Sequence, residues 1–172
     1  MKKLLFALFT IPALLFAGCS GGGNPIDMVK TGSLQFDTSV TVGDALSGYQ
    51  YFSNTSWKSY EDPQKRTIVE FNGVLDYDKF IGSKLQGMEL TADMVKNGKK
   101  QLGDIKLTYV AQFTISKTDE TFDVQFSGLN MAGTNRQTGE AVNQNIPDSD
   151  LTSLQYIYSN QPEPSTWGLL GS

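Results

Sequence analysis

The chain has 172 residues, with 14 basic and 18 acidic side chains, a formal net charge of −4 and one cysteine. It contains no histidine, which excludes Ser-His-Asp and Cys-His catalysis and every metal site built on imidazole ligands. An acidic chain is a poor match for a phosphate backbone, so we expect no nucleic-acid partner.

The first residues have the pattern of an export signal. Lys2 and Lys3 precede an apolar run at 4–16, and small residues follow it. The run is shorter than the ~20 residues that span a bilayer, and a basic start, a short apolar segment and small residues define a signal peptide. We therefore predict a signal peptide at 1–18. Its removal takes Lys2 and Lys3 from the 14 basic residues and leaves 12 against 18 acidic ones.

The end of that run, Leu15-Phe16-Ala17-Gly18-Cys19, resembles the lipobox of bacterial lipoproteins. In that family a lipid is joined to the cysteine sulfur and the leader is cut just before it. The resemblance implies a lipidated Cys19 and a membrane partner held through the lipid, because two or more acyl chains anchor a protein stably. Ser20 follows the cysteine, which by the same resemblance favours the outer membrane, and a Gram-positive cell surface is the alternative.

Beyond the cysteine, the Gly-rich segment 19–30 predicts a flexible tether, and 31–160 is long enough for a single domain. A brief strand is expected at 33–37. Thr41, with Asp44 three residues later, has the spacing of a capping box and predicts a helix at 42–50.

Alternating apolar residues predict the strands, which we place at 57–61, 67–77, 105–116 and 121–131. In the clearest one, 105–116, every odd position is apolar. Phe113 is therefore expected to face the core and Gln112 the solvent. In 121–131 the apolar phase changes at Gly128, which suggests a bulge there.

Less regular segments connect and follow these strands. A helix at 91–97 is predicted within the long excursion 78–104, and 132–147 is expected to be irregular. Asp148 or Ser149 is predicted to cap a last helix at 151–158, and 161–172 to form a loose C-terminal tail. The fold class is then α+β, a small antiparallel sheet of about four strands with helices packed on one face.

Several segments are also similar to a family of small exported bacterial proteins without assigned function. They are Thr41-Val42-Gly43-Asp44-Ala45, Tyr51-Phe52-Ser53-Asn54, Trp57, Val69-Glu70-Phe71-Asn72-Gly73 and Gln112-Phe113-Thr114. The similarity covers about 29–160 without the excursion. It implies a fold and neither a catalytic residue nor a cofactor.

Charged residues form four small groups that we interpret as solvated turns or helix ends. Carboxylates that could bind calcium or act as a glycosidase pair are Asp76 and Asp78, and Asp119, Glu120 and Asp123. Asp148 and Asp150 suit the start of a helix. Lys96, Lys99 and Lys100 form a basic cluster that could contact phosphate or lipid head groups. We expect no metal site and no cofactor.

Aromatic residues gather before the second strand and form a possible binding patch, namely Tyr49, Tyr51, Phe52, Trp57 and Tyr60. The expected function is that of a membrane-anchored envelope lipoprotein that binds a protein, a glycan or another envelope component without catalysis. Two alternatives stay open. One is a glycosidase-like hydrolase that uses acidic residues alone, with two carboxylates ~5–10 Å apart in a pocket, and the other is a purely structural envelope protein.

Overall fold

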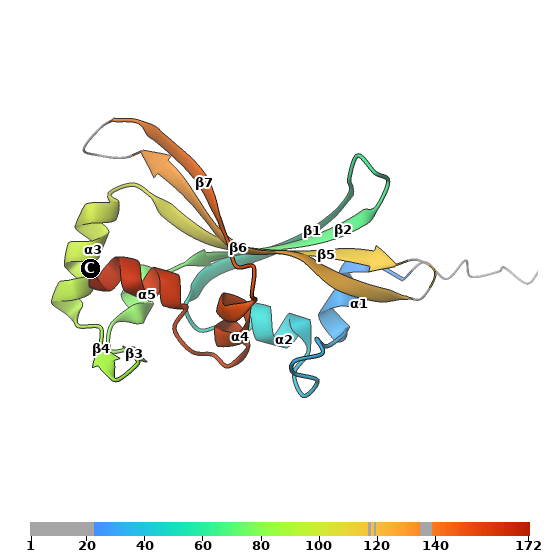
Figure 1. Cartoon of the computed structure of the whole chain (residues 1–172), viewed down its shortest axis with the longest axis horizontal. Coiled ribbons are helices and arrows are strands. Elements are labelled where there is room, and N and C mark those ends of the chain that lie inside the picture. Colours follow the sequence, from blue (N-terminus) through green and yellow to red (C-terminus); the bar gives the residue numbers. More distant parts are fainter. Residues whose placement is uncertain (1–22, 117, 119, 135–138) are drawn as a thin grey trace, which may run out of the picture.

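The computed structural model describes residues 23–116, 118, 120–134 and 139–172, so the predicted signal peptide, Cys19 and Asp119 lie outside the described residues. One layer of strands lies on one layer of helices (Figure 1), which confirms the α+β class. The helices are α1 (Pro25–Thr31), α2 (Val42–Ser47), α3 (Ala92–Leu102), α4 (Thr152–Tyr158) and α5 (Pro164–Gly171), with a 3-10 turn, η1 (Tyr77–Phe80). The strands are β1 (Phe52–Glu61), β2 (Thr67–Leu75), β3 (Lys84–Leu85), β4 (Met88–Glu89), β5 (Lys106–Ser116), β6 (Thr121–Thr134) and β7 (Ala141–Pro147).

The main sheet is antiparallel and has five strands, in the order β1-β2-β5-β6-β7, where about four were predicted. Its central strand β5 alternates between buried and half-buried residues along most of its length, as its sequence predicts. The buried side chains face the helices and form the core, among them Leu107, Tyr109, Ala111 and Phe113. The helices α1, α2, α4 and α5 lie on that one face of the sheet, whereas α3 stands beside one end of it (Figure 1). The β1–β2 and β6–β7 hairpins rise away from α1, α2, α4 and α5.

The bulge in β6 is real, but it is not at Gly128. Gln112 pairs with Phe126 and Phe113 with Val124, so Gln125 is the extra residue. An inserted residue turns the following side chains to the opposite face of the sheet. Phe126 therefore lies on the outer face rather than in the core.

The N-terminal part of the domain differs from two predictions. The tether predicted at 19–30 is wrong from Pro25 onwards, because α1 begins there, with Asn24 as its cap, and buries Val29 completely. A strand at 33–37 is also wrong, since only an isolated bridge joins Leu34 and Asp37. The next helix is confirmed in α2, where Thr41 Oγ1 accepts the N–H of Asp44 at 3.1 Å.

The C-terminal segment 161–172 is not a loose tail. Pro164 begins α5, in which Trp167 and Leu170 are buried. This helix packs against α3, which runs past the predicted end at 97 to Leu102. Leu170 lies so close to Gly98 that a larger side chain there would strike its backbone.

The contact between α3 and α5 gives a pair of opposite expectations. A Cβ at Gly98 would lie 2.7 Å from Cα of Leu170, whereas one at Gly168 would meet nothing within 4 Å. We expect Gly98→Ala to lower the free energy of unfolding by about 1–2 kcal/mol, because overpacking outweighs the gain in helix propensity. Gly168→Ala should raise it by about 0.5–1 kcal/mol. Urea unfolding measures both, and two changes of the same sign would contradict this packing.

The segment 132–147 is more regular than predicted. β6 continues to Thr134, and β7 pairs with it as an edge strand. The apolar alternation of β7 is incomplete, because Gln144 lies on the same face as Val142 and Ile146, which are only half-buried. The excursion 78–104 is likewise ordered, as η1, the β3–β4 hairpin and α3. Among the described residues no helix has the length and apolar character needed to cross a membrane.

Candidate functional site: the outer face of the sheet

The predicted aromatic patch is wrong as a surface. Tyr49, Tyr51 and Phe52 are only 3–6 % exposed and belong to the core. Trp57 packs on the Phe71 ring at 4.9 Å between ring centroids, and only Tyr60 is substantially exposed. The chain turns inward after α2, so these aromatic residues close the core beneath β1 and leave no patch to bind with.

The small charged groups mostly bind to one another or to nearby backbone. Asp76 Oδ1 accepts the N–H of Asp78, and the Asp78 carboxylate pairs with Lys99 at 2.8 Å. Lys99 is thus already occupied in the basic cluster that it forms with Lys96 and Lys100 on α3. In the part of the chain that the structure describes, no group of three His, Cys, Asp or Glu residues could hold a metal ion.

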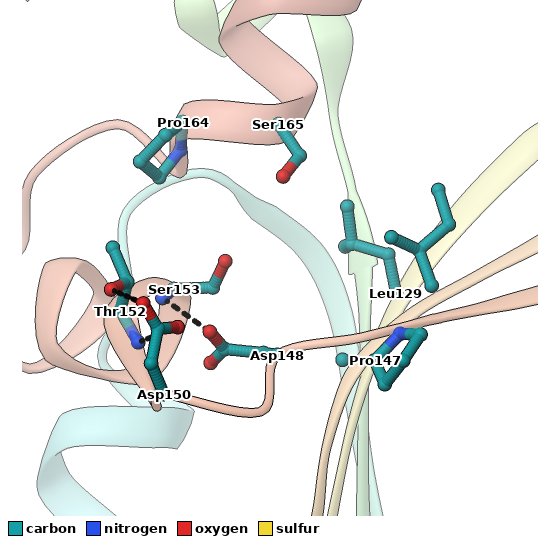
Figure 2. A pocket seen from close by; sticks show the side chains of 10 residues that line it. Leu129, Pro147, Asp148, Asp150, Thr152, Ser153, Pro164 and Ser165 are labelled. Carbon is teal, nitrogen blue, oxygen red and sulfur yellow. Dashed lines mark hydrogen bonds between the residues drawn. The ribbon is translucent and has the colours of Figure 1, made fainter.

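A pocket of about 190 Å³ lies between the end of β7 and the helices α4 and α5. Figure 2 shows two carboxylates in it, Asp148 and Asp150, each turned toward the first turn of α4. Asp148 accepts the N–H groups of Ser153 and Leu154, both at 3.0 Å, and the hydroxyl of Ser127 at 2.8 Å. The N-cap residue of α4 is Leu151, which gives no side-chain cap, so the predicted cap position is wrong. The Asp148 carboxylate nevertheless accepts the N–H groups of the first turn in its place.

A third carboxylate, Glu163, is fully buried behind this pocket. It accepts the hydroxyl of Ser153 at 2.7 Å and the N–H groups of Ser165 and Thr166 at 3.0 and 2.7 Å. Asp148 and Glu163 are thus joined through Ser153, yet their oxygens are engaged in capping α4 and α5. A glycosidase acid must reach its substrate, and a fully buried carboxylate engaged in this way does not.

The outer face of the sheet offers a different kind of site. No helix within the described ranges covers it (Figure 1). Strand register places a set of mainly polar side chains there, which we call the outer face: Asn54, Ser56, Lys58, Tyr60, Ile68, Glu70, Asn72, Val74, Thr108, Val110, Gln112, Thr114, Phe126, Asn130, Asn143 and Asn145. Neutral amide and hydroxyl groups dominate it.

Glu70 is the centre of a hydrogen-bond network on this face. Asn72 Nδ2 and Lys58 Nζ lie 2.9 Å from its Oε1, and Gln112 Nε2 and Tyr60 Oη lie 2.9 and 3.2 Å from its Oε2. The Glu70 side chain is only 11 % exposed, although none of the described helices lies over it. Neighbouring side chains on three strands therefore cover and fix this carboxylate.

The electrostatics of the network keep Glu70 ionised. Burial raises the pKa of the Glu70 carboxyl, whereas hydrogen bonds from Asn72, Lys58 and Gln112 lower it. The lowering outweighs the effect of burial, so the pKa lies below its usual value. Hydrogen bonding to Glu70 raises the pKa of the Lys58 ammonium in turn. The two opposite charges compensate one another, so this part of the face is polar without net charge.

Beside the network the face is hollowed by a pocket of about 310 Å³. We call it the amide hollow, and its lining is Glu70, Asn72, Val110, Gln112, Phe126, Asn130 and Asn145. The Asn130 amide donates to the side-chain oxygens of Asn145 at 2.9 Å and Asn143 at 3.2 Å. These bonds hold the amides of β6 and β7 in place along one side of the hollow.

Sequence reasoning placed parts of this site but did not assemble it. Alternation places Glu70 and Asn72 on the solvent side of one strand and Gln112 on the solvent side of another. Only the register of β2 against β5 shows that these side chains are neighbours. Asn145 was missed because β7 was expected to be irregular. The repeated Asn-x-Asn spacing at 143 and 145 is the signal that could have indicated a polar edge strand.

A comparison of the chain with protein-family models, with curated proteins and with solved structures finds no match. The resemblances to the lipobox and to small exported proteins therefore stay predictions.

Proposed function

We propose that this chain is an exported envelope protein, anchored to a membrane through a lipid on Cys19, that binds an envelope component without catalysis. The outer membrane is the proposed site of anchoring. The observation that carries the binding role is the uncovered outer face, on which a fixed polar network borders the amide hollow. Polar groups held in fixed positions lose little entropy when they bind a ligand.

The hydrolase alternative has less support. A general acid or base must contact the substrate. Asp148 and Glu163, which are joined through Ser153, accept N–H and hydroxyl groups of the protein. Glu70 is likewise surrounded by donors, and its lowered pKa is the reverse of what a general acid needs.

Crosslinking in intact cells tests the binding role. A diazirine amino acid would replace Asn143, an exposed residue of β7 on the outer face, in the full chain. The matched control carries the same group at Asn97, an exposed residue of α3 in the helical layer. We expect a discrete adduct from position 143 and none from 97. Adducts from position 97 alone, or from neither position, would contradict a binding site on this face.

Lipidation gives a separate prediction. Because the thiol of Cys19 is the only cysteine thiol in the chain, Cys19→Ala should abolish incorporation of a fatty-acid analogue and leave an uncleaved or wrongly cleaved precursor. Metabolic labelling followed by gel analysis measures both effects. The conservative control is Ser20→Ala, which should be labelled and cleaved as the natural chain is. A labelled Cys19→Ala protein would overturn the lipoprotein proposal.

A further inference from the structure

The lining of the amide hollow has a specific chemical character. Four of its side chains are amides, Asn72, Gln112, Asn130 and Asn145, and two are apolar, Val110 and Phe126. An amide side chain presents both donors and an acceptor. This mixture suits a ligand whose groups both donate and accept hydrogen bonds and which also has apolar faces.

Part of this hydrogen-bonding capacity is unused. Within the described residues, no hydrogen bond occupies the amide oxygens of Asn72, Gln112 and Asn130 or the amide nitrogen of Asn145. The same amides are held by their other atoms, to Glu70 or to one another. The hollow therefore presents fixed acceptors and a donor to whatever enters it.

Charge narrows the choice of ligand. The hollow contains one carboxylate, Glu70, and its charge is matched by Lys58 at 2.9 Å. No cationic side chain lines it, and the whole chain is acidic, so an anionic ligand is disfavoured. A cation would find Glu70 already engaged by its donors. The complement of such a lining is a neutral polar molecule.

A protein partner fits less well. The buried centre of a protein–protein interface is apolar and poor in charged groups. Of the large apolar side chains found exposed on the described residues, only Tyr60 stands on the outer face. The centre of the face holds Glu70 and amides instead. At about 310 Å³ the hollow is at the small end of ligand pockets, which measure about 300–1,000 Å³.

We propose that the amide hollow is a binding site for a neutral glycan, whose hydroxyl groups pair with Asn72, Gln112, Asn130 and Asn145 while its C–H faces rest on Phe126 and Val110. Each sugar hydroxyl both donates and accepts, as the amides do, and pyranose rings have C–H faces that pack on aromatic side chains. This inference rests on the proposed binding function and names its ligand class.

Calorimetry on the natural protein tests it, using the product matured from the full chain in a bacterial host and purified in mild detergent. The probes are linear tetramers of glucose, galactose, mannose and N-acetylglucosamine, with polygalacturonate as an anionic counterpart. At least one neutral probe should bind saturably and polygalacturonate should not. Asn130→Ala and Asn145→Ala should each weaken that binding about tenfold, the effect of one or two lost hydrogen bonds. Asn97→Ala, the same change on the exposed side of α3, should leave it unchanged.

Failure of this inference is distinguishable from failure of the proposed function. If no neutral probe binds, or if both outer-face variants bind as well as the natural protein, the glycan assignment is wrong. A crosslinked adduct at position 143 whose added mass is protein would then leave the binding role intact with a protein partner. Absence of both sugar binding and adduct would overturn both proposals.

Discussion

Replacing Phe113 by alanine is expected to lower the free energy of unfolding by about 3–5 kcal/mol. The ring is fully buried on the inner face of β5. Its centroid lies 5.7 Å from that of Phe122 and 6.4 Å from that of Trp57, so its removal opens a cavity between three strands. Because cores are packed nearly as densely as crystals, the surroundings close such a cavity only in part. Urea unfolding with an unchanged m-value measures the loss.

The matched control is Phe36→Ala. Phe36 is 42 % exposed and makes one edge-on contact with Tyr158, at 4.9 Å between ring centroids. We expect this substitution to lower the free energy of unfolding by less than about 1.5 kcal/mol. Equal losses for the two phenylalanines would show that the inner face of β5 has been assigned wrongly.

Gln112, the neighbour of Phe113 in β5, is not a neutral control for the Phe113 substitution. Alternation correctly places Gln112 on the opposite face of the sheet. The structure shows its amide donating to Glu70 Oε2 at 2.9 Å, and a hydrogen bond to a charged group contributes about 1.5–3 kcal/mol. The pattern of one strand gives the face of a residue, but the neighbour on that face depends on the next strand.

The same distinction separates what the sequence predicts from what it leaves open. β5 was predictable because its apolar residues alternate along the whole strand, and β2 because Val69, Phe71 and Leu75 share one face. To predict the outer-face site, one must know three strand registers and the bulge at Gln125. The sequence pattern of a single strand does not determine any of these. The aromatic patch failed for a related reason: a cluster in sequence does not say which side of the chain faces the core.

The helices at the two ends of the described chain, α1 and α5, form although their sequences have only weak helical patterns. α1 follows a Gly-rich stretch, and α5 contains two glycines, so neither has the periodicity of a typical helix. Asn24-Pro25 and Glu163-Pro164 are nevertheless cap and first-turn pairs, since proline is favoured at the first helical position. Those pairs could have indicated both helices, whereas burial of Val29 and Leu170 depends on packing that no local pattern contains.

Replacing Glu163 by alanine is expected to lower the free energy of unfolding by about 2–5 kcal/mol. The carboxylate caps α5 through the N–H groups of Ser165 and Thr166, and loss of a cap costs about 1–2 kcal/mol. It also accepts the buried hydroxyl of Ser153 at 2.7 Å, and a buried donor left without an acceptor costs about 1–3 kcal/mol. Ser153 donates its N–H to Asp148 as well, so the substitution disturbs the start of both C-terminal helices.

A double-mutant cycle with Ser153→Ala separates these two contributions. If the hydroxyl of Ser153 is stranded when Glu163 is lost, removing that hydroxyl as well should add little further destabilisation, and the double variant should be about as stable as Glu163→Ala alone. Glu163→Gln, which keeps the shape and one acceptor oxygen, should lose less than Glu163→Ala. Urea unfolding of the natural protein, the two alanine variants and their double variant measures the coupling. Strictly additive losses would mean that the Ser153–Glu163 hydrogen bond contributes nothing, and the role of Glu163 would then be reduced to capping α5.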